Sequence, residues 1–439
     1  MNTYKELKGG NQVLFALYHI GPGMLNQFIT TWLLVFLAGG DSILLQASLV
    51  GVCLMLGRLV DAVSDPLVAN WSDRLTGGKL GRRMPFIIGG TVPMILAFNM
   101  LWYTQMLPYE WLRFIWVCVA VNLFYFAYTV VVNPYFALLP EIAKDKKQRM
   151  FIQSFIAFFG ILGMGIAMGA SGFLIDLLGF AGAGLAMSLV CAATLVGPVL
   201  TVRVNTSAVQ PPQNEKSSSN ILVSLKDALS NKTFRTYIFG FCVFYLGFQM
   251  VQYNLAFITT VLLGQNKGMS STLFIVSVVV GLLFIPVYNM MLRRMSCATA
   301  LKIAICAYVV VALLIACIPL LLRTGLSGQA LGFVLMALLG FPYSGLMVIP
   351  NIIVSEIIDE DVRRNHVHRE ALFFGVQGLI NKFMVSLAAL FVGFLQDFLG
   401  NTADKPWGVI AVAPAAALVS LVGFYFVTRL RITQEGGAQ

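Results

Sequence analysis

Charged side chains are scarce in this chain. Only 11% of its 439 residues are Asp, Glu, Lys or Arg, whereas soluble domains carry about 25%. A folded protein needs polar side chains over every surface that meets water, so most of this surface must face lipid instead. Together with a hydrophobic content of 58% and a mean hydropathy of +0.83, this scarcity predicts an integral membrane protein.

The residue types that carry most enzyme chemistry are also few or isolated. The chain has three histidines, His19, His366 and His368. The last two share a charged segment that lacks the tight ligand spacing of a metal site, so a solvated loop is the favoured interpretation. The seven cysteines are scattered singly without metal or redox spacing, and no glycine-rich phosphate loop appears. An enzyme, an ATP-driven pump and a cofactor are therefore not expected.

Long apolar runs dominate what is present. A helix needs about 20 apolar residues to cross a bilayer, and twelve runs meet that length. The predicted spans lie near 12–38, 46–72, 85–106, 112–139, 150–176, 182–203, 236–262, 270–292, 298–322, 328–357, 370–397 and 406–429. The first run is longer than the apolar region of a signal peptide and is expected to stay as a helix. The fold class is thus predicted to be all-α and membrane-integral.

One long polar stretch, VNTSAVQPPQNEKSSSN, separates the first six spans from the last six. Its composition cannot form a core, which predicts a linker. The expected organisation is an N-terminal half over 1–203, a cytoplasmic linker over 204–235 and a C-terminal half over 236–439. Six plus six helices around a central loop is the architecture of the major facilitator superfamily, although no sequence repeat between the halves is visible. A monomer is expected.

The net charge of +10 is concentrated in short loops on one side of the spans. No loop builds a folded basic face, so a nucleic-acid partner is not expected. The asymmetry is typical of the positive-inside rule, and it predicts that both termini and the central loop are cytoplasmic.

Three charged residues fall inside the second span, in GRLVDAVSDP: Arg58, Asp61 and Asp65. A charge at a helix centre costs at least about 2.5–3.5 kcal/mol in insertion experiments, so such residues are usually functional. Asp61 and Asp65 are four apart and share one helical face. Two neighbouring carboxylates favour a positive ion between them, and Na⁺ or H⁺ is able to come and go. The pattern predicts a cation site; the alternative is a structural Arg58–Asp61 pair with Asp65 near the membrane edge.

A further charge, Lys382, lies in the eleventh span with no acid among its nearest helical neighbours. An isolated lysine in lipid is costly, so it is expected to face the bundle interior, toward Asp61 or Asp65. The alternative is a snorkelling lysine whose ammonium reaches the membrane edge.

Three segments carry a family resemblance. GRLVDAVSDPLVANWSDRLTGGKLGRRMPF resembles the hallmark segment of the glycoside–pentoside–hexuronide:cation symporters, the group of the melibiose permease. YTVVVNPYFALLPEIAKDKKQR is similar to the family's fourth helix and following loop, and SEIIDEDVRRNHVHREALFFGVQGLINK to its tenth-to-eleventh helix junction. The resemblance implies cation-coupled symport by alternating access in a bacterial inner membrane.

The resemblance also implies roles for individual residues. The cation-binding group would be Asp61, Asp65 and the hydroxyl of Thr129, with Na⁺ or H⁺ as the coupling ion and Na⁺ held at the two acids. Lys382 and Arg58 would couple the cation to the solute. The expected cytoplasmic latch consists of Asp73, Arg74, Arg82, Arg83, Asp145 and Arg149.

The positions with which the melibiose permease holds its galactoside are replaced here by Asn26, Val132, Phe136 and Ala157. The loss of charge-assisted hydrogen bonds removes most of the interactions that hold a galactoside. A different sugar or glycoside is favoured, held by Asn26, Gln27, Tyr128, Asn133, Phe136 and Gln377. The alternative is a lysophospholipid or another amphipathic solute whose acyl chain would contact Val132 and Phe136. A membrane scaffold or receptor is the rival from another class, but it would not need the buried acids.

Overall fold

The computed structural model describes residues 4–39, 43–74, 80–143, 145–204, 221–365 and 370–430, without the side chains of residues 73, 74, 146, 221–224, 364, 365, 370 and 371. Helices make up almost all of the regular structure in this part of the chain. Among the described residues, Tyr4 and Val204 form an isolated antiparallel β-bridge. The chain divides into two compact units, residues 1–216 and 217–439.

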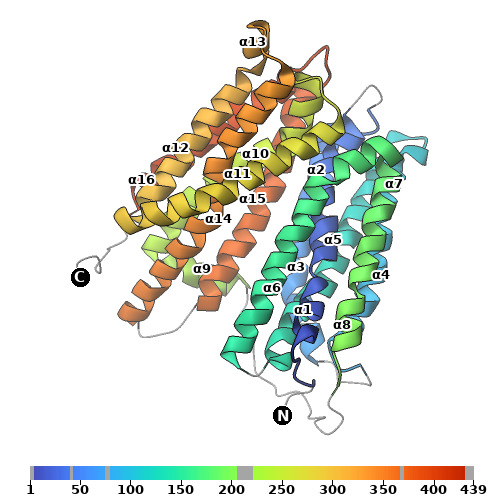
Figure 1. Cartoon of the computed structure of the whole chain (residues 1–439), viewed down its shortest axis with the longest axis vertical. Coiled ribbons are helices and arrows are strands. Elements are labelled where there is room, and N and C mark those ends of the chain that lie inside the picture. Colours follow the sequence, from blue (N-terminus) through green and yellow to red (C-terminus); the bar gives the residue numbers. More distant parts are fainter. Residues whose placement is uncertain are drawn as a thin grey trace. The chain divides into compact units, whose positions relative to one another are not determined.

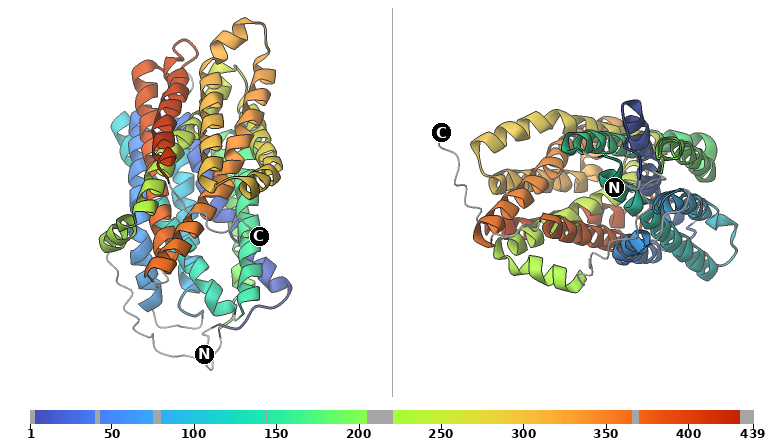
Figure 2. Two further views of the ribbon diagram at one scale, coloured as in Figure 1. Left: turned by 90° about the vertical axis from the view of Figure 1, so that its left-hand side faces the viewer. Right: turned by 90° about the horizontal axis from the view of Figure 1, so that it is seen from below.

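The helices of the first unit are α1 (Gly10–Leu17), α2 (Ile20–Ala38), α3 (Ala47–Arg74), α4 (Met84–Trp102), η1 (Thr104–Met106), α5 (Glu110–Ile142), α6 (Lys146–Gly169), α7 (Ser171–Thr194) and α8 (Val196–Thr201). Those of the second unit are α9 (Ile221–Ser230), α10 (Lys232–Phe257), the π-helix η2 (Ile258–Leu262), α11 (Lys267–Arg294), α12 (Cys297–Ala316), α13 (Ile318–Arg323), α14 (Gly328–Asn365), α15 (Glu370–Leu399) and α16 (Trp407–Thr428). Within each unit the long helices lie side by side (Figure 1, Figure 2).

Twelve helical spans in the described residues are long and apolar enough to cross a membrane. They fall where the apolar runs predicted them, so the twelve-helix, all-α fold is confirmed. The boundary between the fifth and sixth spans is displaced: α6 ends at Gly169 rather than near 176. A helical segment follows, and the chain changes direction at Gly179, whose φ of 71° and ψ of 176° lie outside the helical region.

The first span consists of two helices. The backbone N–H of His19 donates to Ala16 O over 3.1 Å, and that of Gly21 donates to Tyr18 O over 3.1 Å. These bonds span three residues rather than four. Pro22 has no N–H, and its ring clashes with the carbonyl four residues earlier, that of Tyr18, in a regular helix. The proline therefore breaks the span between α1 and α2.

The helix pairings of one unit repeat in the other. In the first unit α3 and α4 both pack against α5. Helix α2 packs against α6 and α7, and α4 also contacts α7. In the second unit α11 and α12 both pack against α14. Helix α10 packs against α15 and α16, and α12 also contacts α16. Each unit therefore contains the same arrangement of six spans, although the two sequences show no evident repeat.

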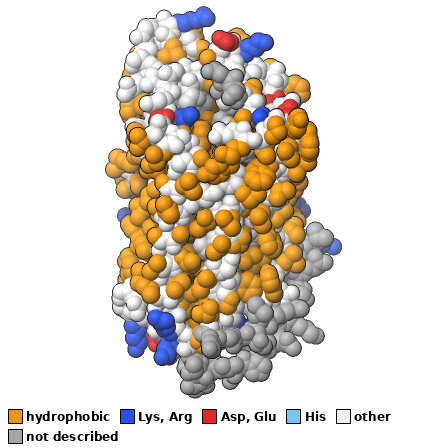
Figure 3. All heavy atoms as spheres, turned by 90° about the vertical axis from the view of Figure 1, so that its right-hand side faces the viewer, with side chains coloured by type: hydrophobic (Ala, Val, Ile, Leu, Met, Phe, Trp, Pro, Cys, Tyr) orange, Lys and Arg blue, Asp and Glu red, His pale blue; other side chains and the backbone are white. Residues whose placement is uncertain are grey.

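Large apolar side chains point outward along the spans. Leu189 of α7 is 72% exposed and Phe398 of α15 is 82% exposed, which water would penalise and lipid would not. Hydrophobic side chains fill the middle of the face drawn in Figure 3, and most of its charged side chains lie toward the two ends. This distribution is that of a protein whose middle is solvated by lipid.

Helices α3 and α5 approach each other closely at Gly57. A Cβ at this position would lie 2.5 Å from side-chain carbons of both Tyr125 and Val121. No residue larger than glycine fits there without displacing α5, and the acid pair of α3 follows one and two turns later.

Gly57→Ala is therefore expected to lower the free energy of unfolding by about 1–3 kcal/mol through overpacking. The matched control is Gly165→Ala on α6, where nothing lies within 4 Å of the added carbon. The control is expected to be neutral or to gain up to about 1 kcal/mol of helix stability. Thermal unfolding of the purified variants in detergent measures both. A Gly57→Ala protein as stable as the control would contradict the close contact.

Candidate functional site

Two hydrogen-bonded rungs join α3 to α5 in the middle of the first unit. The hydroxyl of Thr129 donates to Asp61 Oδ1 over 2.7 Å. One turn further along both helices, Asn133 Nδ2 donates to Asp65 Oδ1 over 3.0 Å and lies 3.2 Å from the Asp65 carbonyl oxygen. Because partners in both rungs are separated by 68 residues, the two helices run parallel in constant register.

The first rung is buried, with Asp61 and Thr129 each 1% exposed, and Asp65 is partly exposed. A carboxylate in such surroundings needs compensation by hydrogen bonds or by a positive charge. Carboxylate and hydroxyl oxygens are hard ligands, suited to hard cations. Within the described residues no group of three or more His, Cys, Asp or Glu is placed to hold a metal ion. The arrangement therefore suits a small monovalent cation better than a transition metal.

Arg58 lies one turn before this pair and connects three helices. Its guanidinium carbon lies 4.5 Å from the centre of the Tyr125 ring on α5, a cation–π geometry. Its Nη2 donates to Thr30 Oγ1 of α2 over 3.2 Å. Arg58 thus places a positive charge beside the acid pair and fixes α2 and α5 to α3.

The residues predicted to hold the solute occupy several helices. Asn26 and Gln27 lie on α2, where Gln27 Nε2 donates to Thr31 Oγ1 over 3.2 Å. Tyr128 of α5 is partly exposed, and Phe136 is 36% exposed. Asn133, another predicted solute residue of α5, instead donates to Asp65, a contact that the sequence prediction did not include.

Lys382 and Gln377 lie on α15 of the second unit. Gln377 is 7% exposed, and its Oε1 atom is buried without a hydrogen-bond partner among the described residues. Lys382 is partly exposed, and its backbone carbonyl accepts a hydrogen bond from Ser386 Oγ over 3.1 Å. The approach of Lys382 to Asp61 or Asp65 stays a prediction.

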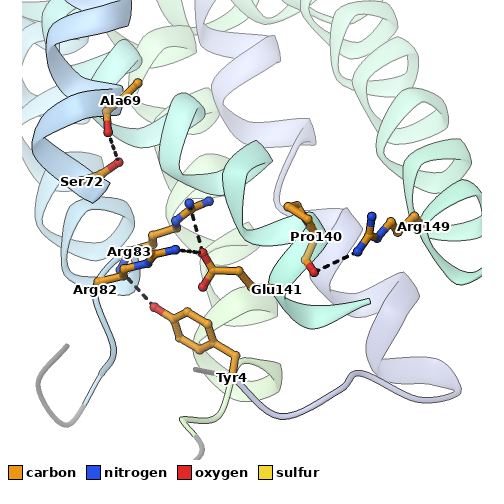
Figure 4. A network of polar contacts seen from close by, with 8 residues as sticks. All are labelled: Tyr4, Ala69, Ser72, Arg82, Arg83, Pro140, Glu141 and Arg149. Carbon is orange, nitrogen blue, oxygen red and sulfur yellow. Dashed lines mark hydrogen bonds and ion pairs between the residues drawn. The ribbon is translucent and has the colours of Figure 1, made fainter. Parts of the chain in front are cut away.

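A second cluster lies at one end of the first unit, where two arginines share one carboxylate. Arg82 Nη2 lies 2.5 Å and Arg83 Nη2 lies 3.0 Å from Glu141 Oε1 (Figure 4). The Arg83 backbone N–H donates to the hydroxyl of Tyr4 over 3.0 Å. Burial raises the pKa of the Tyr4 phenol above its ordinary value, so the phenol stays neutral. Tyr4 also pairs with Val204, which ties the start of the chain into the cluster.

Of the six residues of the predicted latch, this cluster contains Arg82 and Arg83, and the latch itself stays a prediction. The side chains of Asp73 and Arg74 lie outside the described residues. Asp145 is exposed, and it makes no side-chain hydrogen bond to the start of α6. Arg149 donates to the backbone carbonyls of Ala143 (3.0 Å) and Pro140 (3.4 Å), as Figure 4 shows for Pro140.

Sequence reasoning missed Glu141 and Tyr4. Glu141 lies inside the segment that carries the family resemblance, one residue after Pro140 at the end of a predicted span. An acid at that point was a usable signal. Nothing in the sequence indicated Tyr4, because its partners are 79 and 200 residues away.

Twelve apolar spans, one of which carries an acid pair beside an arginine, are typical of secondary transporters. The chain belongs to the MFS/sugar transport protein family, whose model matches residues 14–429. This confirms the resemblance to the glycoside–pentoside–hexuronide:cation symporters. The family is one of multi-pass membrane transporters, not of enzymes.

Individual relatives agree with this assignment. A protein of Escherichia coli K12 named "Putative glycoside/cation symporter YagG" is 25% identical over 86% of this chain and 79% of its own length. Sodium-dependent lysophosphatidylcholine symporter 1 of Homo sapiens is 22% identical over 80% of this chain and 68% of its own. An uncharacterized symporter of Synechocystis is 34% identical, but the match covers 33% of this chain and only 27% of that protein.

Solved structures share the fold. The nucleoside transporter NupG superposes with a TM-score of 0.66 at 16% identity, covering 96% of this chain and 99% of that one. A bacterial homolog of the human lysosomal transporter Spinster gives 0.67 at 13% identity and 96% coverage of both chains. These structures show the fold alone. The family model and the symporter relatives support a cation-coupled symporter of the major facilitator type.

Glu141→Gln is expected to destabilise the cluster by about 1–3 kcal/mol, because Arg82 and the buried Arg83 lose the negative charge that they share. Accessibility labelling of single cysteines at the two ends of the first unit would detect the resulting shift in resting conformation. Glu110→Gln makes the same carboxylate-to-amide change at an exposed site of the first unit and serves as the control. If Glu110→Gln shifted the labelling as strongly as Glu141→Gln, the cluster would not be the latch.

Proposed function

We propose that this protein couples an inward Na⁺ gradient to symport of a sugar or glycoside. The observation that carries the proposal is the pair of rungs between α3 and α5. They set two carboxylates one turn apart, each oriented by a neutral donor from the neighbouring helix: Thr129 at Asp61, and Asn133 at Asp65. The family and its named symporter relatives support the coupling.

Na⁺ fits this group better than H⁺ does. A hydroxyl has one donor and two acceptor lone pairs, so Thr129 is able to donate to Asp61 and still offer a lone pair to a cation. The Asn133 amide turns its N–H toward Asp65 and fixes the direction of that carboxylate. A proton would need neither a third oxygen nor a fixed carboxylate direction.

Electrostatics link the cation to the transport cycle. Residues four apart on a helix lie about 5–6 Å from each other, and two like charges at that separation repel by about 3 kcal/mol at an effective dielectric constant of about 20. Closing a dry cavity around both carboxylates strengthens the repulsion, and a bound cation removes it. Only the empty carrier and the carrier with both cation and solute then switch between the outward- and inward-facing states. Cation binding and solute binding therefore become mutually dependent.

Arg58 and Lys382 complete this proposal as coupling residues. Arg58 already contacts α2 and α5 beside the acid pair, so cation binding there is felt by helices that also carry predicted solute residues. The carrier is proposed to work as a monomer in a bacterial inner membrane, with both termini and the segment between α8 and α10, including helix α9, in the cytoplasm. Arg82, Arg83 and Glu141 are proposed to form the latch.

A carbohydrate is the favoured solute. The predicted solute residues of α2, Asn26 and Gln27, carry neutral amides, and Phe136 presents a partly exposed ring. Amides beside an aromatic face suit sugar hydroxyls and the apolar face of a sugar ring. The matching family model is described as one of sugar transport, and the relative YagG is named for a glycoside.

A lysophospholipid is the second candidate. It is favoured by the match to the human lysophosphatidylcholine symporter over 80% of this chain. Val132, 9% exposed, and Phe136 stand at galactoside-binding positions of the melibiose permease, and they would contact an acyl chain favourably.

A cation-by-solute screen of the purified protein tests the proposal. Thermal unfolding is measured in Na⁺, Li⁺ or K⁺, each with sugars or with lysophosphatidylcholine. We expect Na⁺ alone to raise the unfolding temperature, and a sugar to raise it further only when Na⁺ is present, because ligands stabilise the state that they bind. Asp61→Asn and Asp65→Asn should abolish both effects and Na⁺-driven uptake in proteoliposomes.

Asp227→Asn is the matched control, since Asp227 is exposed on α9 of the second unit, and it should behave as the wild type. Full Na⁺-driven uptake by both acid-pair variants would falsify the cation site. Stabilisation by lysophosphatidylcholine and by no sugar would replace the carbohydrate with the second candidate.

The hydroxyl of Thr129 can be tested separately. Thr129→Val keeps the shape of the side chain but removes an oxygen ligand. It is expected to weaken apparent Na⁺ affinity about tenfold, equivalent to about 1.4 kcal/mol. Thr129→Ser restores the hydroxyl and should recover most of that affinity. Na⁺ titrations of the unfolding temperature measure both variants; equal affinities for Val and Ser would show that the hydroxyl is not a ligand.

A further inference from the structure

His19 occupies the break in the first span, between α1 and α2. The break is supported from α5, because the hydroxyl of Tyr135 donates to the carbonyls of Phe15 (3.1 Å) and Ala16 (3.4 Å). The same carbonyls also accept the backbone N–H groups of Tyr18 (3.4 Å) and His19 (3.1 Å) at the end of α1. His19 is therefore held at a fixed point of the membrane-spanning part of the first unit.

Helices α5 and α6 pack against the imidazole. Its ring lies parallel to that of Tyr135, with centroids 6.1 Å apart, and edge-on to that of Phe136 at 5.2 Å. From α6, Gly160 approaches so closely that a Cβ there would lie 2.8 Å from His19 Cδ2. The ring thus has a defined orientation among α2, α5 and α6.

The imidazole Nδ1 atom is buried and makes no hydrogen bond with any described residue. Asn26, two turns further along the same span, is in the same situation: its Oδ1 atom is buried without a hydrogen-bond partner in the described part of the chain. Residues seven apart lie on one helical face, about 10 Å apart along the axis. A buried polar atom without a partner costs about 1–3 kcal/mol, so two on one face call for a ligand that completes them.

We propose that His19 is a specificity-determining residue of the solute site, and that its Nδ1 atom and Asn26 Oδ1 accept hydrogen bonds from two hydroxyls of one neutral solute. Nδ1 is an acceptor when the imidazole proton resides on Nε2. The edge-on Phe136 ring beside His19 offers an apolar surface to the same solute. The proposal rests on symport of a carbohydrate, and it makes that solute uncharged and hydroxyl-bearing at both of its ends.

The chemistry of the two acceptors also sets what the site rejects. Nδ1 and Oδ1 accept hydrogen bonds, and so do the oxygens of a carboxylate. A solute carboxylate would therefore face these atoms with no proton between them, and it would not be held. Uronates should therefore bind more weakly than the corresponding neutral sugars. A deoxy sugar that lacks the hydroxyl leaves a buried acceptor unpaired. A site built to bind a hydroxyl therefore rejects such a sugar more strongly than an apolar pocket rejects an extra hydroxyl.

Two substitutions at His19 separate hydrogen bonding from packing. The amide of asparagine reaches the position of Nδ1, whereas that of glutamine reaches the position of Nε2. Unfolding temperatures are measured for the wild type, His19→Asn and His19→Gln with Na⁺ alone and with Na⁺ plus xylobiose, raffinose, melibiose or glucuronate. For a sugar that stabilises the wild type, His19→Gln should lower the apparent affinity at least tenfold, and His19→Asn should lower it much less.

Tyr18→Phe is the control. It removes a buried 2.6 Å hydrogen bond to Thr91 from the neighbouring position, so it should lower the unfolding temperature without changing the apparent affinities for the sugars. Asn26→Leu should weaken the same sugar as His19→Gln does. All these variants should keep the shift caused by Na⁺ alone.

Equal sugar affinities for His19→Gln, His19→Asn and the wild type would overturn the role of His19, as would a preference for glucuronate over the neutral sugars. Loss of the Na⁺ shift together with the sugar shift in both His19 variants would reduce His19 to a packing residue. A wild type that responds to Na⁺ and to none of the sugars would overturn the proposed carbohydrate and this inference together.

Discussion

The protein depends on two carboxylates kept inside a lipid-solvated bundle. Placing them there costs free energy, which neighbouring groups offset. Helix α5 supplies the donors Thr129 and Asn133 in register with the two acids, and Arg58 places a positive charge against the Tyr125 ring. The register itself depends on Gly57, which lets α3 and α5 approach one turn before the first acid. Packing, hydrogen bonding and charge are thus coupled on a single helix pair, the one at which we propose the cation binds.

The predicted solute residues Asn26 and Gln27 are connected to the same pair through α2. Arg58 reaches Thr30, and Thr30 Oγ1 donates to the carbonyl of Asn26 over 3.0 Å. A short chain of contacts therefore runs from the acid pair to the face of the first span that carries Asn26 and, two turns earlier, His19. Because the first span is interrupted at His19, its segments are able to adjust when the contacts at Arg58 change. This continuity gives the proposed coupling between cation and solute a physical path within one unit.

The cluster around Glu141 shows why the charges at the end of the bundle are more than a signal for orientation. One carboxylate neutralises two arginines only in part, and the buried Arg83 is held further by the backbone contact to Tyr4. Lys5 N–H donates to the Arg203 carbonyl over 2.8 Å, so the first residues described join the ends of α4, α5 and α8. A segment that looks like an unremarkable polar terminus in sequence thereby becomes part of the packing at this end.

Hydropathy alone determined the twelve spans, because a helix that crosses lipid must be apolar over about 20 residues. The cost of buried charge by itself singled out Arg58, Asp61 and Asp65, and the family resemblance placed Thr129 beside them. Only the tertiary structure decided which residues meet: Asn133 with Asp65, Glu141 with Arg82 and Arg83, and the repeated helix pairing of the two units. Contacts between residues 59 to 200 positions apart leave no local pattern, since packing complementarity is a property of two surfaces, whereas hydropathy is a property of one segment.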